Sequence, residues 1–95
     1  MVAKNPANAL ARFGLANEAV KENLLEEARE QYAAYLSMHD DDGNGYQRLA
    51  EVLARLGDLS GARAALRRGI DASRRFGHPS MANELEARLE ELDEG

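Results

Sequence analysis

Two stretches, RFGLANEA at residues 12–19 and YQRLAEVL at residues 46–53, decide the fold of this chain. Each places a leucine, a small residue and an apolar residue at the same helical spacing. The shift along the chain that superimposes Leu15 on Leu49 also superimposes the apolar positions that follow, namely Leu25 on Leu59, Ala28 on Ala62, Tyr32 on Leu66 and Leu36 on Ile70. The sequence therefore predicts two copies of one helix–turn–helix unit.

The spacing of apolar residues is helical along almost the whole chain, and no segment shows the sustained alternation typical of a strand. The helical pattern is interrupted at Glu22–Asn23, in the acidic segment 39–45, at Gly57–Asp58 and at Gly77–Pro79. We expect an all-α chain of five antiparallel helices near residues 6–22, 24–38, 44–56, 59–76 and 80–92, with Ser80 as the N-cap of the last.

Length and composition restrict the class of protein. The 95 residues make one domain, 1–95, and 44% apolar with 31% charged residues is a composition that folds. Cysteine is absent, so the sequence excludes disulfides, thiolate metal sites and a cysteine nucleophile. No apolar run has the length of a membrane span, and the opening MVAKNPANAL lacks the apolar core of a signal peptide, so we expect a cytoplasmic protein.

Charge is unevenly distributed along the chain. Residues 1–45 carry a net charge of −4, residues 46–79 carry +4 and residues 80–95 carry −5, which makes −5 in total. An acidic chain favours neither nucleic acids nor anionic membranes as partners. The basic block contains a helical stripe formed by Arg63, Arg67, Arg68, Arg74 and Arg75. No aromatic residues alternate with these arginines for base stacking, so we expect them to pair with acidic neighbouring helices rather than to form a nucleic-acid surface.

A repeat of about 34 residues with a large-x-x-Leu-small-x-x-apolar pattern resembles the tetratricopeptide repeat. AREQY at residues 28–32 and ARAAL at 62–66 also resemble the Ala-x-x-x-large pattern of that family. The chain departs from the family where alanine replaces glycine after Leu15 and Leu49, and where Asp40 and Arg74 stand in place of the closing proline. The resemblance implies a right-handed helical-hairpin solenoid with repeats at about residues 9–42 and 43–77, and a capping helix at about 80–92.

The same resemblance implies a function. In tetratricopeptide repeats the first helix of each pair lines a concave groove that holds a peptide segment or a partner helix. The corresponding positions in this chain are Phe13, Asn17 and Lys21, with Gln47, Glu51 and Arg55 as their counterparts in the second repeat. Of the lysine and asparagine residues that clamp a terminal carboxylate in part of the family, only Asn17 is present, and Phe13 is equally suited to the core. We expect a protein-interaction scaffold, without an inferable partner.

The acidic stretch DDDGNGYQRLAE, residues 40–51, offers an alternative function, because it satisfies the pattern of a calcium-binding EF-hand loop. The ligands would be Asp40, Asp42, Asn44, the carbonyl of Tyr46 and Glu51. Against calcium, Gln47 and Arg48 are unsuited to their positions in such a loop, and the repeat requires Tyr46 to lie on a helix already. We therefore expect a helix-capping turn, with a calcium-responsive helical domain as the alternative.

Other chemistry is sparse. The chain has no His-Glu-x-x-His zinc motif and no glycine-rich phosphate loop, so we expect neither an enzyme nor a bound cofactor. The separate acidic and basic blocks leave two states of assembly open. One is a weak homodimer through the first helix or the groove, and the other is a monomer.

Overall fold

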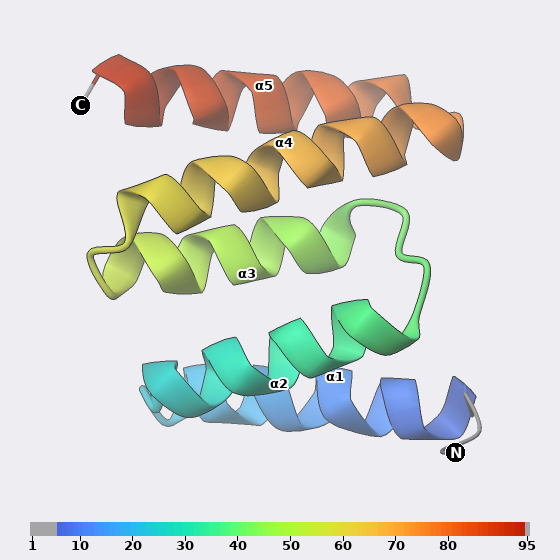
Figure 1. Cartoon of the computed structure of the whole chain (residues 1–95), viewed down its shortest axis with the longest axis vertical. Helices are drawn as coiled ribbons and strands as arrows, with labels where there is room; N and C mark the ends of the chain where they lie inside the picture. The colour runs from blue at the N-terminus through green and yellow to red at the C-terminus, as the bar shows by residue number, and fades with distance from the viewer. Residues whose placement is uncertain (1–5, 95) are drawn as a thin grey trace.

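The computed structural model describes residues 6–94, with the side chains of residues 8–93. Its helices are α1 (Pro6–Lys21), α2 (Leu25–Met38), α3 (Asn44–Arg55), α4 (Leu59–Arg75) and α5 (Pro79–Glu94). Figure 1 shows each helix running antiparallel to the one before it. Residues 6–94 contain no strand, so the all-α prediction is confirmed. None of these helices combines the length and the apolar character that a membrane span requires.

The two hairpins contain the same turn between their helices. Asn23 after α1 and Gly57 after α3 both adopt the left-handed backbone region, with φ of 60° and 86°. The next amide in each hairpin donates back to a carbonyl five residues earlier, Leu24 to Ala19 and Asp58 to Leu53, at 2.8 Å in both. Since Asn23 and Gly57 occupy equivalent positions of the two repeats, the internal repeat is present in the backbone as well as in the sequence.

Helix α5 begins one residue earlier than the sequence suggested. Pro79 is its first residue, where the missing N–H of proline removes nothing that the helix needs. Ser80 is therefore the second helical residue, and its prediction as the N-cap is wrong. By contrast, Asp58 does cap α4, since its Oδ1 accepts from the amide of Gly61 at 2.9 Å.

The core consists of two connected clusters, one for each hairpin. Equivalent positions are buried in both, as the pairs Ala16 and Ala50, Ala28 and Ala62, and Tyr32 and Leu66 show. Val52 of α3 joins the first cluster and so connects the hairpins. Leu85 of α5 is completely buried in the second cluster. Helix α5 therefore covers the apolar side of the second hairpin, as a capping helix would.

One pair of equivalent residues has different surroundings. Leu49 of α3 is partly buried and lines a hollow together with Ala33 and Leu36 of α2. Leu15, its counterpart in α1, is 54% exposed. The difference arises because α3 has the preceding hairpin beside it, whereas among residues 6–94 no helix precedes α1.

Candidate functional site

The second of the three consecutive aspartates, Asp41, holds the turn between α2 and α3 by hydrogen bonds. Asp41 is 5% exposed, and its Oδ1 accepts from the amides of Gly43 and Gly45, each at 2.8 Å. Its Oδ2 accepts from the hydroxyl of Tyr35 at 2.5 Å. Burial, together with this hydrogen bond to a carboxylate, raises the pKa of Tyr35 well above its ordinary value. Asp41 thus joins the end of α2 to the start of α3.

The residues considered as calcium ligands face in different directions. Asp40 pairs with Arg75 at 3.5 Å and Glu51 with Arg88 at 3.6 Å, while Oδ2 of Asp42 lies 3.6 Å from Nε2 of His78. Asn44 and Tyr46 already belong to α3, which begins at Asn44. Within the described residues, no three His, Asp or Glu side chains lie close enough together to hold a metal ion. The structure therefore does not assemble the calcium site of the alternative prediction.

Phe13 and Asn17 of the predicted groove lie together between α1, α2 and α3. The ring of Phe13 packs against those of Tyr32 and Tyr35, with centroids 5.8 and 4.8 Å away. The Oδ1 of Asn17 accepts from the hydroxyl of Tyr32 at 2.5 Å and from Nη1 of Arg48 at 3.3 Å. Burial raises the pKa of Tyr32, so this phenol stays a hydrogen-bond donor. Phe13 is half-buried and belongs to the core as well as to the edge of the predicted groove.

Arg48 was not predicted as a site residue, yet it links these side chains. Its guanidinium lies 5.4 Å from the centre of the Phe13 ring, in addition to its hydrogen bond with Asn17. A signal for it existed in the sequence. Arg48, Val52 and Arg55 follow one another at helical spacing, and the apolar Val52 marks the side of α3 that faces the first hairpin.

The two remaining cations of the predicted groove lie farther along the same helices. Lys21 is exposed and pairs with Glu18 of its own helix at 3.4 Å. Arg55 donates from Nη2 to Oδ1 of Asn23, in the α1–α2 turn, at 2.8 Å. Arg55 thus reaches from α3 to the first hairpin, as Arg48 does.

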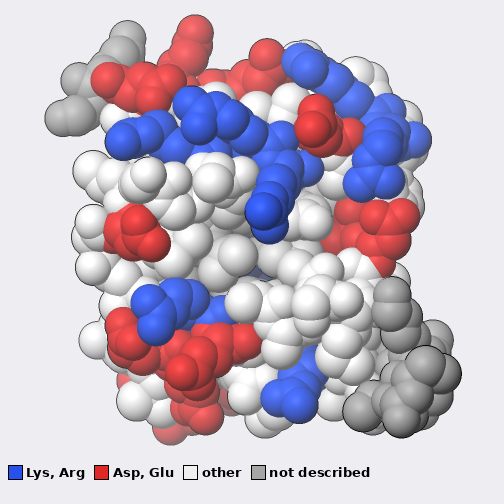
Figure 2. Space-filling view, viewed as in Figure 1, with Lys and Arg blue, Asp and Glu red and all other residues white. Residues whose placement is uncertain are grey.

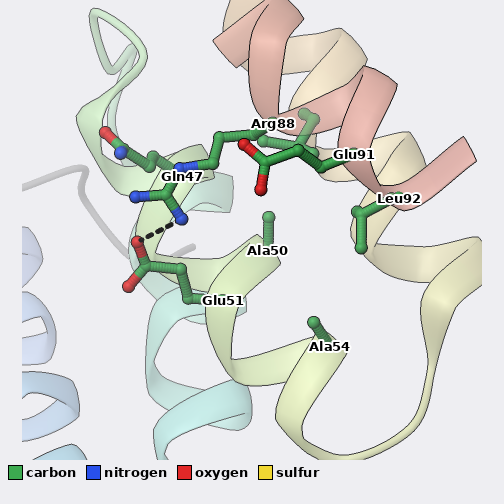
Figure 3. Close-up of a pocket in the computed structure, with 8 residues that line it drawn as sticks. Gln47, Ala50, Glu51, Ala54, Arg88, Glu91 and Leu92 are labelled. Carbon is green, nitrogen blue, oxygen red and sulfur yellow. Dashed lines mark ion pairs between the residues drawn. The ribbon is translucent and has the colours of Figure 1, made fainter. Parts of the chain in front are cut away.

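Gln47 and Glu51 leave α3 on another side and face α5. They line a hollow of about 100 Å³, which we call the α3–α5 hollow. Its other lining residues are Ala50, Ala54, Leu66, Arg88, Glu91 and Leu92. Figure 3 shows Arg88 reaching from α5 to Glu51, and the short side chains of Ala50 and Ala54 below them. The predicted groove residues are thus divided between two adjacent regions, and the contribution of α5 was not foreseen.

Several arginines pair with carboxylates, and others hydrogen-bond to neutral amide groups. Arg63, Arg74, Arg75 and Arg88 each pair with a carboxylate. This confirms that members of the basic stripe pair with acidic neighbours, since Asp93 and Glu86 belong to α5. Arg48 and Arg55, in contrast, hydrogen-bond to the neutral amide oxygens of asparagines, and neither has an ion pair within residues 8–93. Arg48 and Arg55 therefore carry positive charge that no carboxylate within residues 8–93 pairs with.

No family model, curated protein or solved structure matches this chain. The resemblance to tetratricopeptide repeats therefore stays a prediction from the residue pattern.

Proposed function

We propose that this chain is a protein-interaction module of the tetratricopeptide-repeat type, a right-handed solenoid that holds a partner segment along α1, α3 and α5. The repeated hairpins support this proposal, since α2 and α4 begin at Leu25 and Leu59, which are equivalent positions of the two repeats. The cytoplasmic location and the absence of catalysis and of nucleic-acid binding stay predictions from the sequence.

The observation that carries the proposal is the pair formed by Arg48 and Arg55. They are seven residues apart on α3, so about 10 Å separates their backbones. Each can exchange an amide oxygen for a carboxylate, which is the stronger acceptor for a guanidinium. Two acidic residues three positions apart in an extended peptide span about the same 10 Å. We therefore infer an acidic partner segment.

The α3–α5 hollow adds a second contact for the same partner. Ala50 and Ala54 leave room between α3 and α5, and Leu92 provides an apolar wall. About 100 Å³ suits one small apolar side chain rather than an aromatic one. A carboxylate clamp receives no support, since the oxygen of Asn17 already accepts from Tyr32 and Arg48. The partner is thus expected to lie across the helices with its internal residues in contact.

The affinity should be modest. Exposed ion pairs contribute about 0–1 kcal/mol each, so the loss of one should weaken binding by up to roughly fivefold. Two repeats also provide only a short surface. We therefore expect dissociation constants in the micromolar range or weaker.

Selection from a displayed library of random peptides tests this function. The enriched peptides should be acidic. Arg48→Ala and Arg55→Ala should each lower the affinity for these peptides about two- to fivefold, and the double variant should lower it further. Arg67→Ala is the matched control, because it removes the same charge from α4 on the side that faces α5. If no peptide is enriched, or if Arg67→Ala weakens binding as much as Arg48→Ala does, the proposed function is wrong.

A further inference from the structure

A second hollow, which we call the α2–α4 hollow, lies apart from the proposed groove. It measures about 310 Å³ and is lined by Ala33, Leu36, Ser37, Tyr46, Leu49, Ala64, Ala65 and Arg68. Tyr46 and Leu49 leave α3 on a different side from Gln47 and Glu51, because successive residues of a helix turn by about 100°. The two hollows are therefore separate surfaces of one helix.

Small side chains explain why this hollow stays open. Ala33 of α2 faces Ala64 and Ala65 of α4 across it, and none of the three is long enough to fill the space. The floor consists of half-buried Tyr46 and Leu49. An apolar hollow in contact with water is unfavourable, and a surface that covers it gains hydrophobic stabilisation.

Opposite charges border the α2–α4 hollow. On α2, Glu26, Glu30, Ala33 and Ser37 share one face, because they are separated by four, three and four residues. Arg29, four residues before Ala33, lies on this face too and pairs with Glu26 at 2.9 Å, so Glu30 is the carboxylate of this face that is left for a partner. On α4, Arg68 lines the hollow one turn after Ala64. Figure 2 shows acidic side chains near the start of α2 with a basic side chain beside them, and a mainly basic band along α4; the surface between is largely uncharged, apart from an acidic group at its left edge. Neither Glu30 nor Arg68 has an ion pair within residues 8–93.

We propose that the α2–α4 hollow is the contact between two copies of this chain. A twofold axis along the helices places α2 of one copy over α4 of the other, so that the Glu30 side meets the Arg68 side twice. The same rotation brings the two apolar hollows together. A second copy fits this surface because the surface carries both a negative charge, on Glu30, and a positive charge, on Arg68. A partner without charges, or with charges of one sign, would leave at least one of the two without an opposite charge.

The size of the face is sufficient for such a contact. The view in Figure 1 is down the shortest axis, so the face seen there extends over 41 × 31 Å. A protein interface of standard size occupies about 800 Å² on each partner, which this face can accommodate. The proposed dimer leaves the α3–α5 hollow and Arg48 outside the contact, and it does not depend on the proposed function.

Sedimentation equilibrium of the full chain over a wide concentration range tests the dimer. The mass should rise from 10.4 kDa towards twice that value as concentration increases, and less so at high salt. Glu30→Arg and Arg68→Glu should each raise the dissociation constant about tenfold, because each reversal acts at two symmetry-related places. The double variant carrying both changes should restore association, since opposite charges then meet again.

Arg67→Glu is the control, because it makes the same charge change on the side of α4 that faces α5. It should leave the dissociation constant of the dimer unaltered. Circular dichroism of each variant verifies the helical fold. A mass that stays at 10.4 kDa at every concentration overturns the proposal. So does a dimer that tolerates both single reversals, or one that the double variant fails to restore, since the contact would then lie elsewhere.

Discussion

Replacing Asp41 with alanine removes one acceptor that three donors share. The amides of Gly43 and Gly45 and the hydroxyl of Tyr35 would each lose their partner in a region that is almost closed to water. A buried donor left without a partner costs about 1–3 kcal/mol, so we expect a loss of roughly 3–5 kcal/mol in the free energy of unfolding, with some relief from entering water. For a domain of this size that corresponds to a fall in Tm of at least about 12 °C.

Urea unfolding followed by circular dichroism measures this effect. Asp40→Ala is the matched control, because it makes the same change one residue earlier, where the side chain is 71% exposed and pairs with the exposed Arg75. It should change the free energy of unfolding by no more than about 0.5 kcal/mol. Asp41→Asn should be intermediate, since an amide oxygen can still accept from both glycine amides.

The comparison of the free energies of unfolding of the Asp40 and Asp41 variants distinguishes a helix-capping turn from a calcium-binding loop. An EF-hand loop would depend on Asp40 and Asp42 and would tolerate changes at Asp41. The structure requires the reverse, because Asp41 alone of the three is buried. If Asp41→Ala were no more destabilising than Asp40→Ala, the buried carboxylate would neither cap α3 nor hold it to the end of α2.

Three further outcomes are expected. The pKa of Tyr35 is raised in the folded state above its ordinary value of 10.0. Its contribution to stability is therefore complete below about pH 10 and declines as the pH rises towards the folded pKa. Tyr35→Phe should make the free energy of unfolding fall less steeply between about pH 9 and about pH 11. Gly14→Ala should raise the free energy of unfolding by roughly 0.5–1 kcal/mol, because Gly14 lies inside α1 with open space around it. Gly57→Ala should lower it by roughly 1–2 kcal/mol, because Gly57 has a φ of 86°; urea unfolding measures both changes. Millimolar calcium should raise Tm by less than a few degrees, and a large rise that Glu51→Gln abolishes would contradict the helical position of that residue.

The helices could be predicted from the sequence because the signals for them are local. Apolar residues at helical spacing marked the buried side of each helix, and glycine or asparagine marked the ends at Asn23, Gly57 and Gly77. The repeat was visible because both hairpins bury residues at equivalent positions, such as Ala28 and Ala62. Every helix in the structure begins and ends within about two residues of its expected position.

The candidate site was predictable only in part. Phe13 and Asn17 do lie together, yet Gln47 and Glu51 face α5 through a hollow that depends on Arg88 and Leu92. A repeat shift assigns residues to a helix face, but it does not reveal which distant side chains come to meet them. The link from Arg48 to Asn17, which belongs to the preceding hairpin, exists only because α3 packs beside that hairpin.

Helix type, helix order and the internal repeat were thus determined by the sequence itself, because periodicity and turn residues act over a few positions. The tertiary structure alone decided which of three identical aspartates is buried and which arginines lack a counter-ion. Asp40, Asp41 and Asp42 have the same chemistry and differ only in direction, and direction depends on how α2, α3 and α4 pack. In the same way, the surroundings of the charges on Arg48 and Arg68 are formed by residues that are distant in the chain.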